Sequence, residues 1–60
     1  MYMLTDEPEG PNAAWETLDN AFGTEEFSRE NANEALKYVG IHDGYATLDR
    51  LVSEGFVSEV

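Results

Sequence analysis

Few residues in this sequence are of the types that carry out chemistry, and their spacing does not group them. His42 is the only histidine, and it stands beside Asp43 at the expected start of a helix, where a polar turn residue is the ordinary interpretation. The chain has no cysteine, which excludes disulfides, thiolate zinc sites and thiol catalysis. Ser28 and Ser53 have no base and orienting acid at a recognisable spacing. We therefore expect no catalytic residue, no cofactor and no enzyme.

Acidic residues are numerous, and one stretch has the length of a calcium-binding loop. Residues 43–54 begin with aspartate and end with glutamate. A calcium loop needs oxygen ligands at its third and fifth positions and glycine at its sixth, where this chain has Tyr45, Thr47 and Leu48. We expect no metal site there. The carboxylates within residues 6–9 predict a solvated turn that attracts cations only diffusely.

Negative charge dominates the composition. The 60 residues include 13 Asp and Glu but only 3 Lys and Arg, which gives a formal net charge of −10. Apolar residues make up 42% of the chain, too many for a disordered acidic tail, and a chain of this length holds one small core. Anionic membranes and nucleic acid repel such a chain at ordinary ionic strength. The N-terminus has neither a basic region nor a long apolar stretch, so we expect a cytoplasmic protein with no membrane association.

The kind of acidity is similar to that on proteins of extremely halophilic archaea. Lys37 is the only lysine, and glutamate is the commoner acidic residue. In about 1 M salt the Debye length is roughly 3 Å, so the self-repulsion of such a surface is largely screened. The resemblance implies an archaeal protein from a salt-rich cytoplasm. An ordinary acidic protein from a mesophile is the alternative.

The charge is also uneven along the chain. Residues 1–34 contain nine acidic residues and one basic residue, a net charge of −8. Residues 35–60 contain four acidic and two basic residues, a net charge of −2. The C-terminal part is therefore the less repulsive part toward an anionic partner.

The elements that must position these residues follow from apolar spacing. Gly23, Gly40 and Gly55 each follow a segment with apolar residues at helical intervals, where a left-handed C-terminal cap is expected. We expect a single, mainly α domain over residues 1–60, with helices at 12–22, 28–39 and 43–54. The expected apolar faces are Ala14, Trp15, Leu18, Ala21 and Phe22 in the first helix, Ala32, Ala35, Leu36 and Val39 in the second, and Tyr45, Leu48, Leu51 and Val52 in the third.

The starts of the three helices and the two chain ends complete the expected fold. Asn12, Ser28 and Asp43 each precede a helical segment and have side chains that can accept from first-turn amides, so we expect them to be N-caps. Residues 1–5 and 56–60 are the only strand-like stretches. We expect them to pair as a small two-stranded sheet, which needs packing or a second subunit to be stable.

The order of elements from Phe27 onward resembles the helix-turn-helix half of a winged-helix domain. In that family, two leucines three apart end the second helix of the motif, and a glycine and an apolar pair follow. The matching residues are Leu48, Leu51, Gly55, Phe56 and Val57 for this pattern and Ala35, Leu36, Val39, Gly40 and Ile41 for the preceding helix and turn. The resemblance implies a winged-helix-like fold, without the returning strand and tip of the wing. An unrelated small helical bundle is the alternative.

The same resemblance implies a DNA-binding transcriptional regulator or an accessory to one, with double-stranded DNA as partner. Recognition helices contact base edges through their N-terminal part, which here offers His42, Tyr45, Thr47 and Arg50. Arg50 can read guanine, and Thr47 can meet a thymine methyl or a phosphate. So few basic residues make the counterion-release contribution small. The alternative is a protein–protein interaction module that binds no nucleic acid.

Aromatic residues indicate where an assembly would form. Seven aromatic side chains are many for one small core, and aromatics are enriched in interface cores. We therefore expect a homodimer that forms through the first helix or the terminal strands, with Trp15, Phe22 and Phe56 in the interface. Partly exposed aromatics in a monomer are the alternative.

Overall fold

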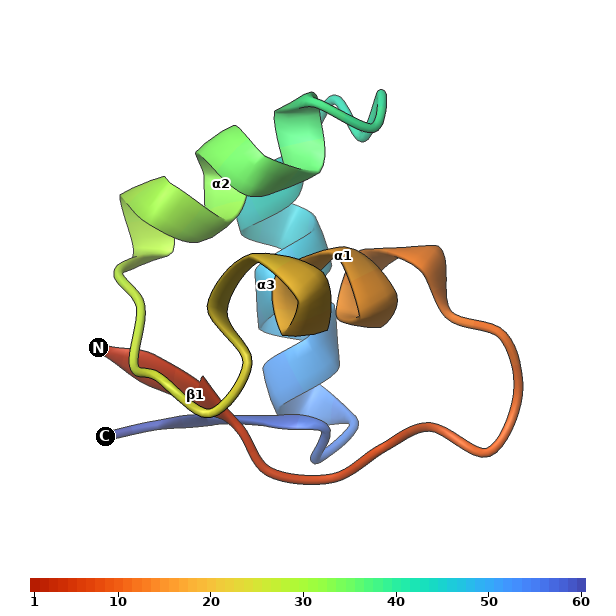
Figure 1. The fold of residues 1–60 in the computed structure, drawn as a ribbon, viewed down its shortest axis with the longest axis vertical. Coiled ribbons are helices and arrows are strands. Elements are labelled where there is room, and N and C mark those ends of the chain that lie inside the picture. The colour runs from red at the N-terminus through yellow and green to blue at the C-terminus, as the bar shows by residue number, and fades with distance from the viewer.

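The computed structural model describes residues 1–60 as three helices and a small sheet (Figure 1). The elements follow in the order β1 (Tyr2–Leu4), α1 (Ala13–Phe22), α2 (Arg29–Lys37), α3 (Gly44–Ser53) and β2 (Val57–Glu59). In the view of Figure 1, α3 runs behind α1, α2 crosses above them, and the two chain ends lie side by side. The chain is mainly α with a small β element made by its termini, as predicted.

The three helix starts have the capping contacts that the sequence predicts. Asn12, Ser28 and Asp43 each accept a hydrogen bond at 3.0 Å from the backbone N–H three residues later. Each of these bonds satisfies one of the first-turn amides that have no partner inside the helix. The predicted starts of the three helices are therefore confirmed, with the cap residue itself just outside each helix.

Two of the helix ends are Schellman motifs built on the predicted glycines. Gly40 has φ 83°, its N–H donates to the carbonyl of Lys37, and the N–H of Ile41 donates to the carbonyl of Leu36. Gly55 has φ 85° and makes the equivalent bond to Val52. These bonds satisfy carbonyls that the helix leaves without a partner, and glycine adopts positive φ without steric cost.

The end of α2 differs from the prediction. The helix ends at Lys37 rather than at residue 39, because Tyr38 and Val39 already belong to the turn that closes on Gly40. Val39 was expected on the buried face but is 55% exposed, and Tyr38 is 89% exposed. Two large apolar side chains therefore stand free at this corner of the molecule.

The sheet pairs the two ends of the chain, as predicted. The antiparallel register joins Tyr2 to Glu59, Met3 to Ser58 and Leu4 to Val57. On its other side, β1 is bridged to Phe27, whose N–H and carbonyl exchange hydrogen bonds of 2.9 and 2.8 Å with Tyr2. The N-terminal strand β1 thus lies between Phe27 and β2. In the winged-helix resemblance, the strand in the place of β2 would pair with the returning strand of the wing.

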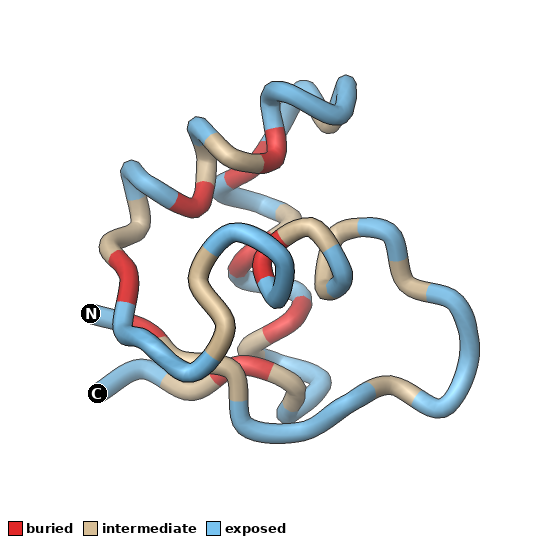
Figure 2. Tube along the Cα trace, in the orientation of Figure 1, coloured by how far each residue is buried: buried red, intermediate tan, exposed pale blue.

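Every element contributes to one small core (Figure 2). The buried apolar side chains are Tyr2, Leu18, Phe27, Ala32, Leu36, Leu48, Leu51 and Val57. The ring of Phe27 stacks on that of Phe22 with centroids 4.7 Å apart and lies 6.3 Å from that of Tyr2. Phe27 therefore connects α1 to the sheet.

Candidate functional site

The four residues predicted to read DNA do not share one face of α3. Successive residues of a helix are about 100° apart, so Tyr45 and Thr47 lie on opposite flanks of the buried stripe. Arg50 lies on the outer face and is exposed. His42 is exposed in the turn before the helix, eight residues from Arg50 in the sequence. The structure therefore spreads these side chains around and along α3.

Thr47 is already engaged within its own helix. Its hydroxyl donates to the carbonyl of Asp43 at 2.9 Å, and the residue is half-buried. This is the common back-bond of threonine to the preceding helical turn. A contact with a base or phosphate would have to replace it.

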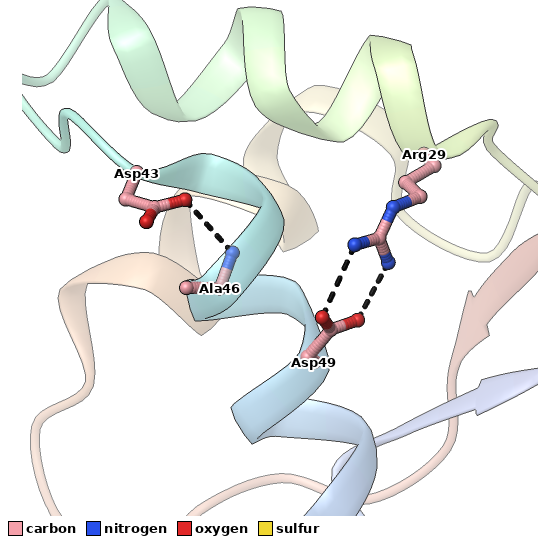
Figure 3. Close-up of polar contacts among 4 residues, drawn as sticks. All are labelled: Arg29, Asp43, Ala46 and Asp49. Carbon is pink, nitrogen blue, oxygen red and sulfur yellow. Dashed lines mark hydrogen bonds and ion pairs between the residues drawn. The ribbon is translucent and has the colours of Figure 1, made fainter.

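An ion pair that the sequence does not predict joins α2 to α3 (Figure 3). The guanidinium of Arg29 makes two parallel hydrogen bonds, of 2.5 and 3.1 Å, to the carboxylate of Asp49. These bonds hold the pKa of Asp49 below its ordinary value. The same bonds, and after them the interaction with the side chain of Tyr2, raise the pKa of Arg29. The guanidinium carbon also lies 5.1 Å from the centroid of the Tyr45 ring. The guanidinium of Arg29 is therefore paired with the Asp49 carboxylate and lies over the Tyr45 ring.

The remaining basic side chains are not gathered either. Lys37 lies 3.9 Å from a carboxylate oxygen of Glu34 on the same helix. Arg50 alone among the three basic residues forms no ion pair. Because Asp43, Asp49 and Glu54 belong to the same helix or its caps, the outer side of α3 presents little positive charge.

The contact between α2 and α3 depends on a glycine that sequence reasoning did not single out. Gly44 is buried at the start of α3, and a Cβ placed on it would lie 2.8 Å from the Cα of Asn33. Real Cβ atoms do not approach backbone so closely. Gly44 therefore lets the two helices pack nearly backbone to backbone at this point. Its position after an N-cap aspartate is the only local signal, and it does not reveal the neighbour.

The three residues predicted for an interface lie partly inside the molecule. Trp15, Phe22 and Phe56 are half-buried and pack against the core. Phe22 also lines an outer groove, and Trp15 lines a separate hollow. The structure accounts for most of their apolar surface without a second subunit.

A shallow apolar groove of about 550 Å³ lies between α1 and α2. It is lined by Thr17, Asn20, Ala21 and Phe22 from α1 and by Asn31, Ala35, Tyr38 and Val39 from α2 and its C-terminal turn. None of these residues is charged, although 27% of the chain is. We call this surface the α1–α2 groove. It holds the most exposed large apolar residue of the chain, Tyr38.

Acidic side chains adjoin the groove on both sides. Asn20 also lines a smaller hollow, together with Glu7, Glu16 and Asp19. Tyr38 also lines a hollow with Glu34 and Lys37. The uncharged groove is thus flanked by carboxylates, and the one flanking cation is paired with one of them.

No three His, Asp or Glu side chains come together in a way that would hold a metal ion. None of the helices has the length and apolar character that crossing a bilayer requires.

Comparison of this chain with protein-family models, with curated protein sequences and with solved structures finds no match in any of the three.

Proposed function

We propose that this chain is a protein–protein interaction module built on a winged-helix-like scaffold, and that a partner protein of opposite charge binds in the α1–α2 groove. The observation that carries the proposal is the groove itself, an exposed apolar surface without a charged residue on a chain of net charge −10. The cores of protein interfaces are depleted in charged residues and enriched in aromatic ones. Tyr38, 89% exposed, has the character of an interface anchor.

Charge favours a different protein over a second copy of this chain. Two copies would bring the carboxylates beside the groove, such as Glu16, Asp19 and Glu34, toward their own counterparts. Like charges brought together across an interface are unfavourable, whereas opposite charges steer association and suppress wrong partners. We propose that the protein acts in the cytoplasm of a salt-rich cell, where apolar contacts persist and long-range repulsion is screened, but charges brought together at an interface are screened much less.

Site-specific photo-crosslinking tests this function. A photoreactive phenylalanine derivative is placed at position 38, in the groove, or at position 46, on the outer side of α3, in the source cells. We expect a discrete adduct from position 38 and none from position 46. The crosslinked protein is then identified, purified and titrated against the chain with and without Ala21→Glu, which puts a carboxylate in the groove. A loss of at least tenfold in affinity supports the proposal; an adduct of the chain with itself, or no adduct, contradicts it.

A second candidate function, DNA binding through α3, rests on one observation: Arg50 is exposed on the outer face of that helix and forms no ion pair. An arginine so placed can make a bidentate contact with guanine. Fluorescence anisotropy with duplex DNA between about 0.2 and 2 M KCl tests this candidate. DNA binding predicts a large loss for Arg50→Glu and a small one for Lys37→Glu, which makes the same change of charge on α2. Absence of binding by the unchanged chain at every salt concentration rules it out.

A further inference from the structure

We infer that the occupant of the α1–α2 groove is one amphipathic helix of the partner, with an apolar stripe bordered by Lys or Arg. The inference rests on the proposed function and adds the conformation and the charge of the segment that binds.

The shape of the groove suits a helix. Its α2 wall runs from Asn31 through Ala35 to Tyr38, residues four and three apart on one face of the helix. These seven steps span about 10 Å, or two helical turns. Ala21 from α1 and Ala35 from α2 both line the groove, and their side chains are small enough for a third helix to approach closely. Packed helices lie about 8–10 Å apart when the side chains between them are small.

Hydrogen bonding favours a helix over an extended segment. A helix satisfies its own backbone N–H and carbonyl groups, whereas an extended segment must find partners on the surface that it covers. The groove offers few such partners. The hydroxyl of Thr17 already donates to the carbonyl of Ala13 at 2.7 Å, which leaves the amides of Asn20 and Asn31 and the hydroxyl of Tyr38 as the other polar side-chain groups of the groove.

The carboxylates beside the groove determine which charge is favourable at the polar positions of the partner helix. Carboxylates lie beyond Asn20 on one side, from Glu16 and Asp19, and beyond Tyr38 on the other, from Glu34. A helix whose apolar stripe enters the groove would place its bordering residues over these carboxylates. Lys or Arg there is attracted, and Asp or Glu is repelled.

Three synthetic peptides of about 14 residues test the inference, a length chosen because shorter helices fray. All share one leucine stripe at helical spacing. The first has lysine at the polar positions, the second has glutamate there, and the third is the lysine peptide with a central proline that breaks the helix. Binding is measured by fluorescence anisotropy at about 0.2 M and 2 M KCl. We expect the lysine peptide to bind at least tenfold more tightly than either of the others at 0.2 M.

Matched variants of the chain locate the binding site. Ala35→Leu fills the groove floor, while Ala46→Leu adds the same volume to the outer face of α3. We expect the first variant to weaken binding of the lysine peptide at least tenfold and the second to leave it unchanged. Unchanged affinity in both variants would show nonspecific attraction to an acidic chain and would overturn the inference, as would equal losses in both, since the binding would then not be located in the groove.

The remaining outcomes of these experiments also test the inference. Equal affinities of the lysine and glutamate peptides would overturn the charge assignment, and equal affinities of the first and third would overturn the helical conformation. A concentration-dependent dimer of the chain in sedimentation equilibrium, lost in Ala35→Leu, would assign the groove to a second copy instead. If no peptide binds while the crosslinked partner binds in a groove-dependent way, this inference fails and the proposed function stands. If both fail, the groove is not a binding surface.

Discussion

The α1–α2 groove and the outer face of α3 are both exposed helical surfaces, yet they differ in how charge is arranged on them. The groove has no charged residue among those that line it, and its carboxylates lie at the edges. The outer face of α3 carries a single basic residue, Arg50, and acidic residues stand at both ends of the helix, Asp43 and Glu54. An apolar surface gains free energy when a partner covers it, whereas one arginine among carboxylates offers an anionic partner little attraction. The difference makes the groove the better binding surface.

The two faces also differ in what holds their helices in place. The inner side of α3 is fixed against α2 by the close approach at Gly44 and by the pair of Arg29 with Asp49. The groove residues Ala21 and Tyr38 are exposed instead, so they contribute little to the packing of α1 on α2. Changes in the groove should therefore alter binding without altering stability, and changes at the α2–α3 contact should do the reverse.

The largest expected effect comes from Gly44→Ala. The new Cβ would meet the backbone of Asn33, which cannot turn aside as a side chain could. Overpacking of this kind costs about 1–3 kcal/mol, a large part of the stability of so small a domain. Urea denaturation measures the loss. Gly10→Ala is the matched control because nothing lies within 4 Å of a Cβ placed there. Equal effects of the two changes would show that the close helix contact is not real.

The next effect compares two exposed tyrosines. Tyr38 stands in the groove and Tyr45 stands on α3 under the guanidinium of Arg29. We expect Tyr38→Ser to weaken partner binding at least tenfold, about 1.4 kcal/mol, with unchanged thermal stability. Tyr45→Ser should leave partner binding unchanged. Calorimetric titration measures partner binding, and thermal melts measure stability. Weaker binding in Tyr45→Ser together with unchanged binding in Tyr38→Ser would place the binding surface on α3.

Salt concentration is expected to affect binding at the two faces differently. Raising KCl from about 0.2 to 2 M shortens the Debye length and screens the self-repulsion of a chain with net charge −10. We expect the melting temperature to rise over this range, as for proteins adapted to high salt. Apolar binding in the groove should survive at 2 M, whereas DNA binding at α3 should weaken. Thermal melts across the salt series measure the stability, and a flat profile argues against adaptation to salt.

The smallest expected effect is that of Asp49→Asn, because exposed ion pairs stabilise little. The folded-state pKa of Asp49 lies below the ordinary value of 3.8, since Arg29 favours the charged form. The stability that this pair contributes is therefore full above about pH 4 and is lost as the pH falls through the lowered pKa. Urea denaturation from pH 6 to pH 2 should show a slightly weaker acid dependence for Asp49→Asn. Glu54→Gln, on the same helix, is the control.

The sequence predicts well those features that depend on neighbouring residues. Asn12, Ser28 and Asp43 cap helices because a short polar side chain reaches an amide three residues away. Gly40 and Gly55 end helices because each allows a backbone conformation that other residues resist. The end of α2 was predicted two residues too late, since apolar spacing alone does not show that Val39 belongs to the Schellman turn rather than to the helix.

Features made by distant residues were not predictable in the same way. Arg29 and Asp49 are twenty positions apart, and Tyr2 and Phe27 are twenty-five apart. Only the folded chain brings them within hydrogen-bonding distance. The predicted DNA-reading residues are a set of neighbours in the sequence, but the helix distributes them around its axis and gives Arg50 no basic neighbour.

By itself, the sequence determined the number of helices, their starts and the charge of the surface, because these depend on local spacing and composition. The pairing of the chain ends is a distant contact, and it was predictable only because no other stretches of the chain are strand-like. The tertiary structure decided which surface is free to bind. The packing of α2 on α3 uses Leu36, Leu48 and Gly44 and pairs Arg29 with Asp49. It leaves Tyr38 exposed and Ala35 only partly buried on the side of α2 that borders the groove with α1. A residue of a given type becomes core, ion pair or binding surface only when the directions of the helices fix its neighbours.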